Sequence, residues 1–170
     1  GRVIGTVNGA LYPEEPPGLT TNGVAVSGDD ITLYIANADK NCLAVVDVSR
    51  PGSSSSKGFI PVGWYPTCVK VIGKKIFVTN GKGFTSFANP NGPNPSKAKE
   101  EVIYREGINN KPVKEQYIAG LFIGSMSIIN QPASMQLSVY SQQVYKNIPY
   151  TKKKEKFSSG EAGNPIPTRV

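Results

Sequence analysis

The residues that could do chemistry are few, and histidine is absent from the sequence. Its absence removes the usual general base, the Ser/His and Cys/His catalytic pairs and the commonest transition-metal ligand. Two carboxylate pairs, Asp29-Asp30 and Glu100-Glu101, are adjacent in sequence. Neighbouring side chains on a strand point to opposite faces, which makes such pairs poor acid/base partners. The sequence therefore predicts no catalytic residue, no metal site and no cofactor in this chain.

Ligand binding has five candidate residues: Tyr12, Trp64, Tyr65, Asn80 and Lys82. Asn80-Gly81-Lys82-Gly83 could present backbone N–H groups and an ammonium group to an anion, because glycines permit close approach. This run lacks the spacing of a Walker loop and no helix follows it, so turn formation is the simpler interpretation. The aromatic residues could stack on a ligand, although large aromatic side chains at such a corner more often serve packing.

Cys42 and Cys68 are the only cysteines. Both lie in apolar, strand-like runs. We therefore expect small buried side chains in preference to a disulfide or a reactive thiol.

The formal net charge is +7, which prompts a search for nucleic-acid or membrane partners. Much of the excess lies near the C-terminus, in Lys146, Lys152, Lys153, Lys154, Lys156 and Arg169. Because no aromatic residues are interleaved within this run, it lacks the stacking platform of a single-strand binder. No apolar run approaches the roughly 18 residues of a membrane span. We expect neither a nucleic-acid partner nor a membrane span.

The candidate residues lie on a succession of short strands that occurs twice, which is typical of a propeller or a similar array. The strands are expected within 2–8, 23–27, 32–36, 43–48, 58–63, 66–72, 75–79 and 121–130, with junctions between repeats near 9–22 and 64–67. The serine-rich run 49–57 is interpreted as a flexible connection. Because the chain opens directly on strand-like sequence without a signal-like start, we expect an internal fragment of a larger protein.

The rest of the chain departs from this pattern. Residues 84–116 are rich in Asn-Pro and Asn-Gly turns and are expected to be an insertion between the second and third strands of the second repeat. Residues 131–150 predict an amphipathic helix, ended by Pro149, and 151–170 have the composition of a linker tail. The apolar stripe of the helix comprises Leu137, Tyr140, Val144 and Ile148.

With these residues in place, TLYIANADKNCLAVVDVS and KKIFVTNGKG resemble the YVTN repeat of bacterial and archaeal β-propellers. The closer resemblance, carried by GFIPVGWYPT, VTNGKG, NPNGPNP, YIAGLFIGSMSIIN and QLSVYSQQVYKNIPY, is to bacterial two-part proteins. These join such a propeller to a phosphoesterase domain of the alkaline phosphatase type. The resemblance implies an exported protein, periplasmic or cell-surface, whose parent is a metal-dependent hydrolase. The metal-binding Asp and His residues of that second domain have no counterparts here.

The expected fold is all-β: a partial propeller of about two four-stranded blades within residues 1–130, part of a roughly seven-bladed ring. The preferred function is a non-catalytic scaffold or docking module, whose partners are the remaining blades and the phosphoesterase domain. A stand-alone YVTN-repeat binding or surface protein and a hydrolase with its site on the propeller are the alternatives. We also expect the 9–22 loop and the 84–116 insertion to rise together over one mouth of the ring. Unpaired blade edges would invite association of chains.

Overall fold

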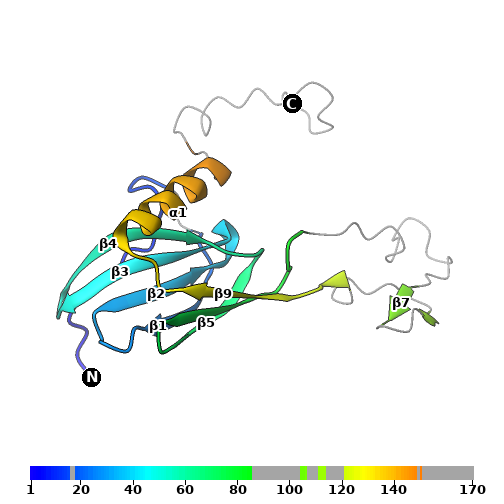
Figure 1. Cartoon of the computed structure of the whole chain (residues 1–170), viewed down its shortest axis with the longest axis horizontal. Coiled ribbons are helices and arrows are strands. Elements are labelled where there is room, and N and C mark those ends of the chain that lie inside the picture. Colours follow the sequence, from blue (N-terminus) through cyan, green and yellow to red (C-terminus); the bar gives the residue numbers. More distant parts are fainter. Residues whose placement is uncertain (16–17, 86–103, 107–110, 114–120, 149, 151–170) are drawn as a thin grey trace.

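The computed structural model describes residues 1–15, 18–85, 104–106, 111–113, 121–148 and 150. Within these residues the fold is mostly β, with two main antiparallel sheets, a small two-stranded ribbon and one α-helix (Figure 1). The expectation of an all-β fold with a single C-terminal helix is therefore confirmed.

The first sheet is a four-stranded antiparallel meander in the order β1-β2-β3-β4. A 3-10 turn, Ala38–Lys40, joins its second and third strands. The left-handed φ of +50° at Asn41 closes this turn, a conformation that asparagine tolerates better than most residues. The four strands are β1 (Thr21–Val26), β2 (Thr32–Asn37), β3 (Cys42–Arg50) and β4 (Ser53–Pro61).

The second sheet has three strands in the order β5-β6-β9. These are β5 (Pro66–Ile72), β6 (Lys75–Asn80) and β9 (Ser125–Asn130). The chain between β6 and β9 contains the ribbon of β7 (Tyr104–Glu106) and β8 (Lys111–Val113). Most of the predicted 84–116 insertion and all of the 151–170 tail lie outside the described residues.

The two sheets share one pairing register between their first two strands. In the first sheet Thr21 pairs with Asn37, and in the second Pro66 pairs with Asn80. In both sheets the register shifts directly after that pair and then continues regularly. A buried asparagine at the end of the second strand thus recurs at the same structural position.

The third strands extend this match. Asn37 pairs with Cys42 in the first sheet, and Asn80 pairs with Ser125 in the second. Counting along the strands from these pairs makes Leu43 equivalent to Met126. The two sheets are therefore copies of one three-stranded unit, and only the first has a fourth strand among the described residues.

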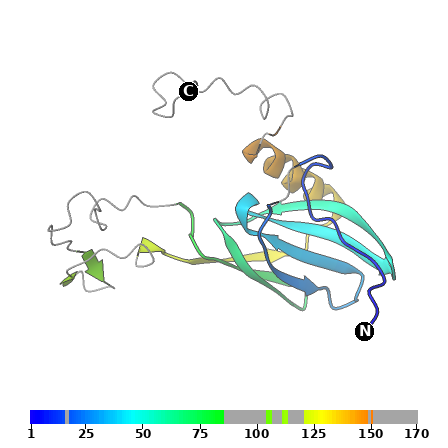
Figure 2. The same ribbon diagram turned by 180° about the vertical axis from the view of Figure 1, so that it is seen from behind.

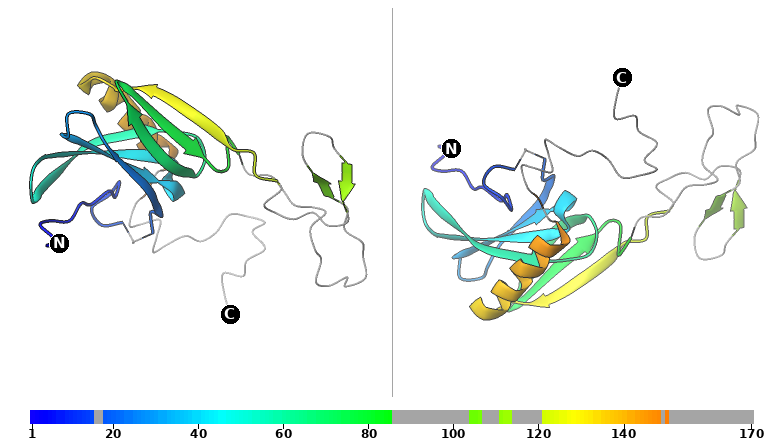
Figure 3. Two further views of the ribbon diagram at one scale, coloured as in Figure 1. Left: turned by 90° about the horizontal axis from the view of Figure 1, so that it is seen from below. Right: turned by 90° about the horizontal axis from the view of Figure 1, so that it is seen from above.

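The sheets stack face to face around an inter-sheet core (Figure 3). The first sheet contributes Tyr34, Ala36, Leu43, Val45 and Ile60, the second contributes Val69, Ile76 and Val78, and the helix contributes Leu137. A second core lies on the other face of the first sheet and comprises Leu11, Ile35, Cys42, Ala44, Val46, Phe59 and Val144. The first sheet is thus covered on both faces.

The helix α1 (Ser134–Asn147) packs on β4. Of the predicted apolar stripe, Leu137 and Val144 are buried, and Tyr140 and Ile148 pack against the two cores. The stripe is confirmed, and the helix, Ser134–Asn147, lies within the predicted range 131–150.

Two strand predictions are wrong. Residues 2–8 form no strand and pair with none of the described strands; Val3 is 83% exposed. The serine-rich run 49–57 is not a loop, since β3 continues to Arg50 and β4 begins at Ser53 after a tight turn in which Gly52 has φ +78°. Backbone pairing with β3 orders these serines although their side chains remain exposed.

Candidate functional site

Four of the five predicted binding residues lie together at one end of the second sheet. Here residues 63–66 and 80–83 run side by side, and we call these two stretches the corner site. Trp64 donates its backbone N–H to the Gly83 carbonyl at 2.7 Å, and Gly81 donates to the Tyr65 carbonyl at 2.8 Å. These bonds hold the two stretches in fixed positions.

Tyr65 adopts a left-handed conformation with φ +59°, which is uncommon for a residue of this size. Its backbone N–H is held by Asn41 Oδ1 at 2.8 Å, from the turn between β2 and β3. Lys82 Nζ lies 4.9 Å from the centre of the Tyr65 ring, within the range of a cation–π interaction. Tyr65 and Lys82 therefore engage each other, and the neighbouring Trp64, 41% exposed, is the aromatic side chain open to a partner.

Asn80 is enclosed within the corner site and is only 1% exposed. Its Nδ2 lies 3.2 Å from Ser125 Oγ and 3.0 Å from Ser127 Oγ, on β9. A side chain at Gly63 would approach the Asn80 amide to 2.7 Å, so only glycine fits above it. The structure places Asn80 as a buried link between β6, β9 and the corner, without an opening toward solvent.

The backbone N–H groups of Gly81, Lys82 and Gly83 are used within the fold. Gly81 and Lys82 donate to the corner carbonyls of Tyr65 and Trp64, and Gly83 donates to the Asn80 carbonyl at 3.3 Å. A nest that binds an anion needs such N–H groups to be free. The run therefore forms a turn, which was the simpler interpretation of its sequence.

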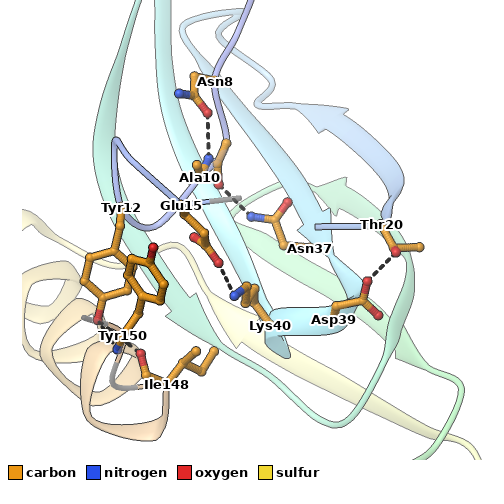
Figure 4. A network of polar contacts seen from close by, with 11 residues as sticks. Asn8, Ala10, Tyr12, Glu15, Thr20, Asn37, Asp39, Lys40, Ile148 and Tyr150 are labelled. Carbon is orange, nitrogen blue, oxygen red and sulfur yellow. Dashed lines mark hydrogen bonds and ion pairs between the residues drawn. The ribbon is translucent and has the colours of Figure 1, made fainter. Parts of the chain in front are cut away.

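Tyr12, the fifth predicted residue, lies away from the corner site, against the C-terminal end of α1 (Figure 4). Its hydroxyl donates to the Ile148 carbonyl at 3.1 Å, and its ring lies 5.4 Å from the rings of Tyr145 and Tyr150. Tyr145 in turn donates its hydroxyl to the Leu11 carbonyl at 3.1 Å. Tyr12 thus ties the N-terminal segment to the helix.

A polar network near the 3-10 turn Ala38–Lys40 was not predicted from the sequence (Figure 4). Glu15 and Lys40 form an ion pair in which the glutamate side chain is only 4% exposed. Asn37 donates its Nδ2 to the Gly9 carbonyl at 2.8 Å, and Thr20 donates its hydroxyl to Asp39. From the sequence, an acidic residue in a proline-rich loop is expected to lie on the surface. Its pairing with Lys40 forms only in the folded chain, so the sequence does not indicate it.

Both cysteines are free, but their settings differ. Cys42 is fully buried, and burial raises the pKa of its thiol to about 12. It is therefore a protonated, inert core side chain, as expected. Cys68 is exposed on the outer face of β5, so the expectation that it is a core residue is wrong; alternation along the strand turns its neighbour Val69 inward instead.

The described residues contain no group of three or more Cys, Asp or Glu side chains arranged to hold a metal ion. Among them, no helix is both long and apolar enough to cross a membrane.

Neither a scan of protein-family models nor a search of curated proteins finds a match to this chain.

Proposed function

We propose that the chain is a two-blade segment of a YVTN-type β-propeller that serves as a non-catalytic scaffold or docking module of an exported, phosphoesterase-type protein. The supporting observation is the shared register of the two sheets, each with a buried asparagine at the end of its second strand. A repeated sheet that stacks on its own copy is the unit from which propellers are built.

The direction of stacking supports this proposal. The first sheet meets the second through the face that carries Leu43 and Val45. Their equivalents on the second sheet, Met126 and Ile128, point away from the first sheet and are 58% and 60% exposed. Each unit therefore uses one face to hold the next unit and the opposite face to hold the previous one. Such a head-to-tail arrangement can be extended into a ring.

The corner site supports a docking role. Trp64 is exposed, and its neighbour Tyr65 engages the Lys82 ammonium group, at the point where the chain leaves β6 toward β7. Tryptophan and tyrosine are enriched among the residues that anchor protein interfaces. In this proposal the corner site contacts the phosphoesterase domain, which lies outside this chain and carries the metal-dependent chemistry.

A binding measurement tests the docking role. The phosphoesterase domain of the parent protein is titrated with this chain, and a dissociation constant in the micromolar range is expected. Trp64→Ala should weaken binding at least about tenfold, which corresponds to roughly 1.4 kcal/mol. Met135→Ala, on the exposed side of α1, is the matched control and should bind normally.

The alternatives give different results. Hydrolysis of p-nitrophenyl phosphate by this chain alone would contradict the non-catalytic role. Equal binding by the wild-type chain and Trp64→Ala would remove the corner site from the interface, and absence of any binding would contradict the docking module.

A further inference from the structure

The N-terminal segment crosses the face of the first sheet that points away from the second sheet (Figure 2). A cavity of about 470 Å³ lies between this segment and the sheet. We propose that this cavity binds a neutral oligosaccharide, with the Tyr145 ring as its apolar platform and the hydroxyls of Ser54 and Ser56 as hydrogen-bonding groups. The cavity shares no residue with the corner site, and binding here does not depend on the docking role.

A β-bulge brings the lining of the cavity onto one face of β4. Val46 pairs with Ser56, and both line the cavity together with Phe59. Ser56 and Phe59 are three residues apart and would lie on opposite faces of a regular strand. The pairing skips Lys57, and Gly58 adopts a φ of +141°, which reverses the alternation at this point. Ser56 and Phe59 therefore both reach the cavity.

Tyr145 of α1 supplies the aromatic surface. Its ring lies 5.8 Å from the Phe59 ring and 5.4 Å from the Tyr12 ring, both in edge contacts, and its hydroxyl donates to the Leu11 carbonyl at 3.1 Å. These contacts fix the ring, yet the residue remains 37% exposed and lines the cavity. A ring that is already held in place loses little conformational entropy when a ligand packs on it.

Neutral hydrogen-bonding groups surround the mouth of the cavity. Thr6, Asn8, Ser54 and Ser56 line it, and all four are exposed. Ser54 donates its hydroxyl to the Thr6 carbonyl at 3.3 Å. Within the described part of the chain, the hydroxyls of Thr6 and Ser56 make no hydrogen bond. Each of these hydroxyls is available both to donate to a ligand and to accept from it.

This combination of groups indicates the class of ligand. Among the described residues, those that line the cavity carry no charge. Arg50 lines a separate cavity of about 210 Å³ beneath residues 4–7. A sugar ring has an apolar C–H face and a rim of hydroxyls, which match an aromatic platform beside free hydroxyls. A charged ligand would lose water in this cavity without gaining a partner of opposite charge. The cavity therefore suits a neutral saccharide better than an ion.

The N-terminal segment is held over the cavity by hydrogen bonds from side chains to its backbone carbonyls. These bonds run from Ser54 to Thr6 at 3.3 Å, from Asn37 to Gly9 at 2.8 Å and from Tyr145 to Leu11 at 3.1 Å. Residues 2–8 belong to none of the described sheets. Lifting this segment to admit a ligand therefore breaks a few hydrogen bonds and no strand pairing.

A printed array of neutral, acidic and amino oligosaccharides tests the class of ligand. The labelled chain is expected to bind neutral members of the array. Binding only to acidic or amino members, or to no member, would overturn the inference.

Two neighbouring serines of β4 give matched variants that test the site. Ser56 lines the cavity, whereas Ser55 pairs with Asp47 and points to the opposite face of the strand. Both serines are exposed, so both substitutions should leave the fold intact. Ser56→Phe fills the mouth and should weaken binding of the tightest neutral oligosaccharide at least about tenfold in calorimetry. Ser55→Phe should bind normally, and equal binding by the two variants would contradict the site.

Tyr145→Ala tests the platform and should also weaken binding at least about tenfold. Because this substitution also removes the hydrogen bond to Leu11, circular dichroism must first show that the variant is folded. If it is not folded, the NMR spectrum of the wild-type chain decides. The tightest neutral oligosaccharide should shift the amide signals of residues 54–59 and of Tyr145, and shifts elsewhere alone would contradict the cavity as the site.

Trp64→Ala separates the cavity from the corner site, since Trp64 is the other exposed aromatic platform considered. This variant should bind the oligosaccharide normally. Loss of binding in Trp64→Ala, with normal binding in Ser56→Phe, would overturn the inference. Oligosaccharide binding without binding to the phosphoesterase domain would support the cavity site and contradict only the docking role.

Discussion

The two sheets are copies of one unit, and they differ in what covers them. The first sheet has cores on both faces and α1 on its outer strand, whereas the second is covered on the face toward the first. Leu43 is fully buried, and its equivalent Met126 is 58% exposed. Equivalent positions in a repeat thus have equal geometry but unequal burial, because burial depends on the place of the unit in the stack.

The largest expected difference in stability is between substitutions at these two positions. Leu43→Ala should lower the free energy of unfolding by about 2–5 kcal/mol, because it removes buried methyl groups and leaves a cavity. Met126→Ala should stay within about 0.5 kcal/mol in dilute solution, where single chains predominate. Urea unfolding of both variants measures the difference. Equal losses would mean that the outer face of the second sheet is already covered.

The buried asparagines give the next comparison. Asn37→Ala and Asn80→Ala should each cost about 1 kcal/mol, because each removes hydrogen bonds to half-buried partners. The local effects should differ: Asn37 bonds the Gly9 carbonyl, and Asn80 bonds two serine hydroxyls of β9. Hydrogen exchange should rise in the N-terminal segment for Asn37→Ala and in β9 for Asn80→Ala. The exposed Asn130→Ala is the control, and identical exchange patterns for the two buried variants would refute the distinction.

The two cysteines also differ in burial. The buried one, Cys42, makes the stability of the fold depend on pH. Burial raises the pKa of the Cys42 thiol from its ordinary value near 9 to about 12. Between these values the unfolded chain loses a proton that the folded chain keeps, so stability falls as pH rises, by up to about 1.4 kcal/mol per pH unit. Below pH 9 this contribution is fully present.

Thermal unfolding from pH 8 to 11 of the wild-type chain and Cys42→Ala measures this slope, which should be shallower in the variant. At pH 8 a thiol reagent should modify Cys68 at once and Cys42 only after unfolding. Rapid modification of both thiols in the folded chain would show that the second core opens readily.

The smallest effect is expected at Asp47 of β3, whose equivalent in the second sheet is Asn130 of β9. The Ser49 hydroxyl and backbone N–H both donate to the Asp47 carboxylate and hold its pKa below the usual range. Asp47→Asn gives the first sheet the residue of the second. The side chain is 32% exposed and an amide oxygen can still accept from Ser49, so the midpoint of urea unfolding should hardly change. Titration of the carboxyl by NMR should show the lowered pKa in the wild-type chain. A midpoint shift as large as that of Asn37→Ala would contradict this ranking.

Much of the fold could be predicted from the sequence, because local patterns carry it. The apolar runs of β2, β3, β5 and β6 and the stripe from Leu137 to Ile148 indicated their elements, and bounds mostly agreed within a residue or two. Residues 2–8 have the composition of a strand but pair with none of the described strands, and composition alone cannot supply a partner. Ser53 begins a strand because β3 offers its backbone, which outweighs the weak strand preference of serine.

The candidate site was predicted less completely. The spacing of Trp64-Tyr65 and Asn80 to Lys82 indicated residues that the fold does bring together, because β5 and β6 are neighbours in sequence. The burial of Asn80, the contact of Tyr12 with α1 and the Glu15–Lys40 pair depend on segments far apart in the chain. No local pattern encodes such contacts.

The connection between β6 and β9 has a consequence for the order of folding. β1 to β4 are joined by short turns, so the first sheet can form through contacts between neighbours in sequence. β9 reaches β6 only after residues 81–124 are closed into a loop, which costs chain entropy before any pairing is gained. The first sheet and the β5–β6 hairpin should therefore form early, and β9 and α1 should join last. Until they do, the edges of β4 and β6 are both open, and chains are most prone to aggregate in that interval.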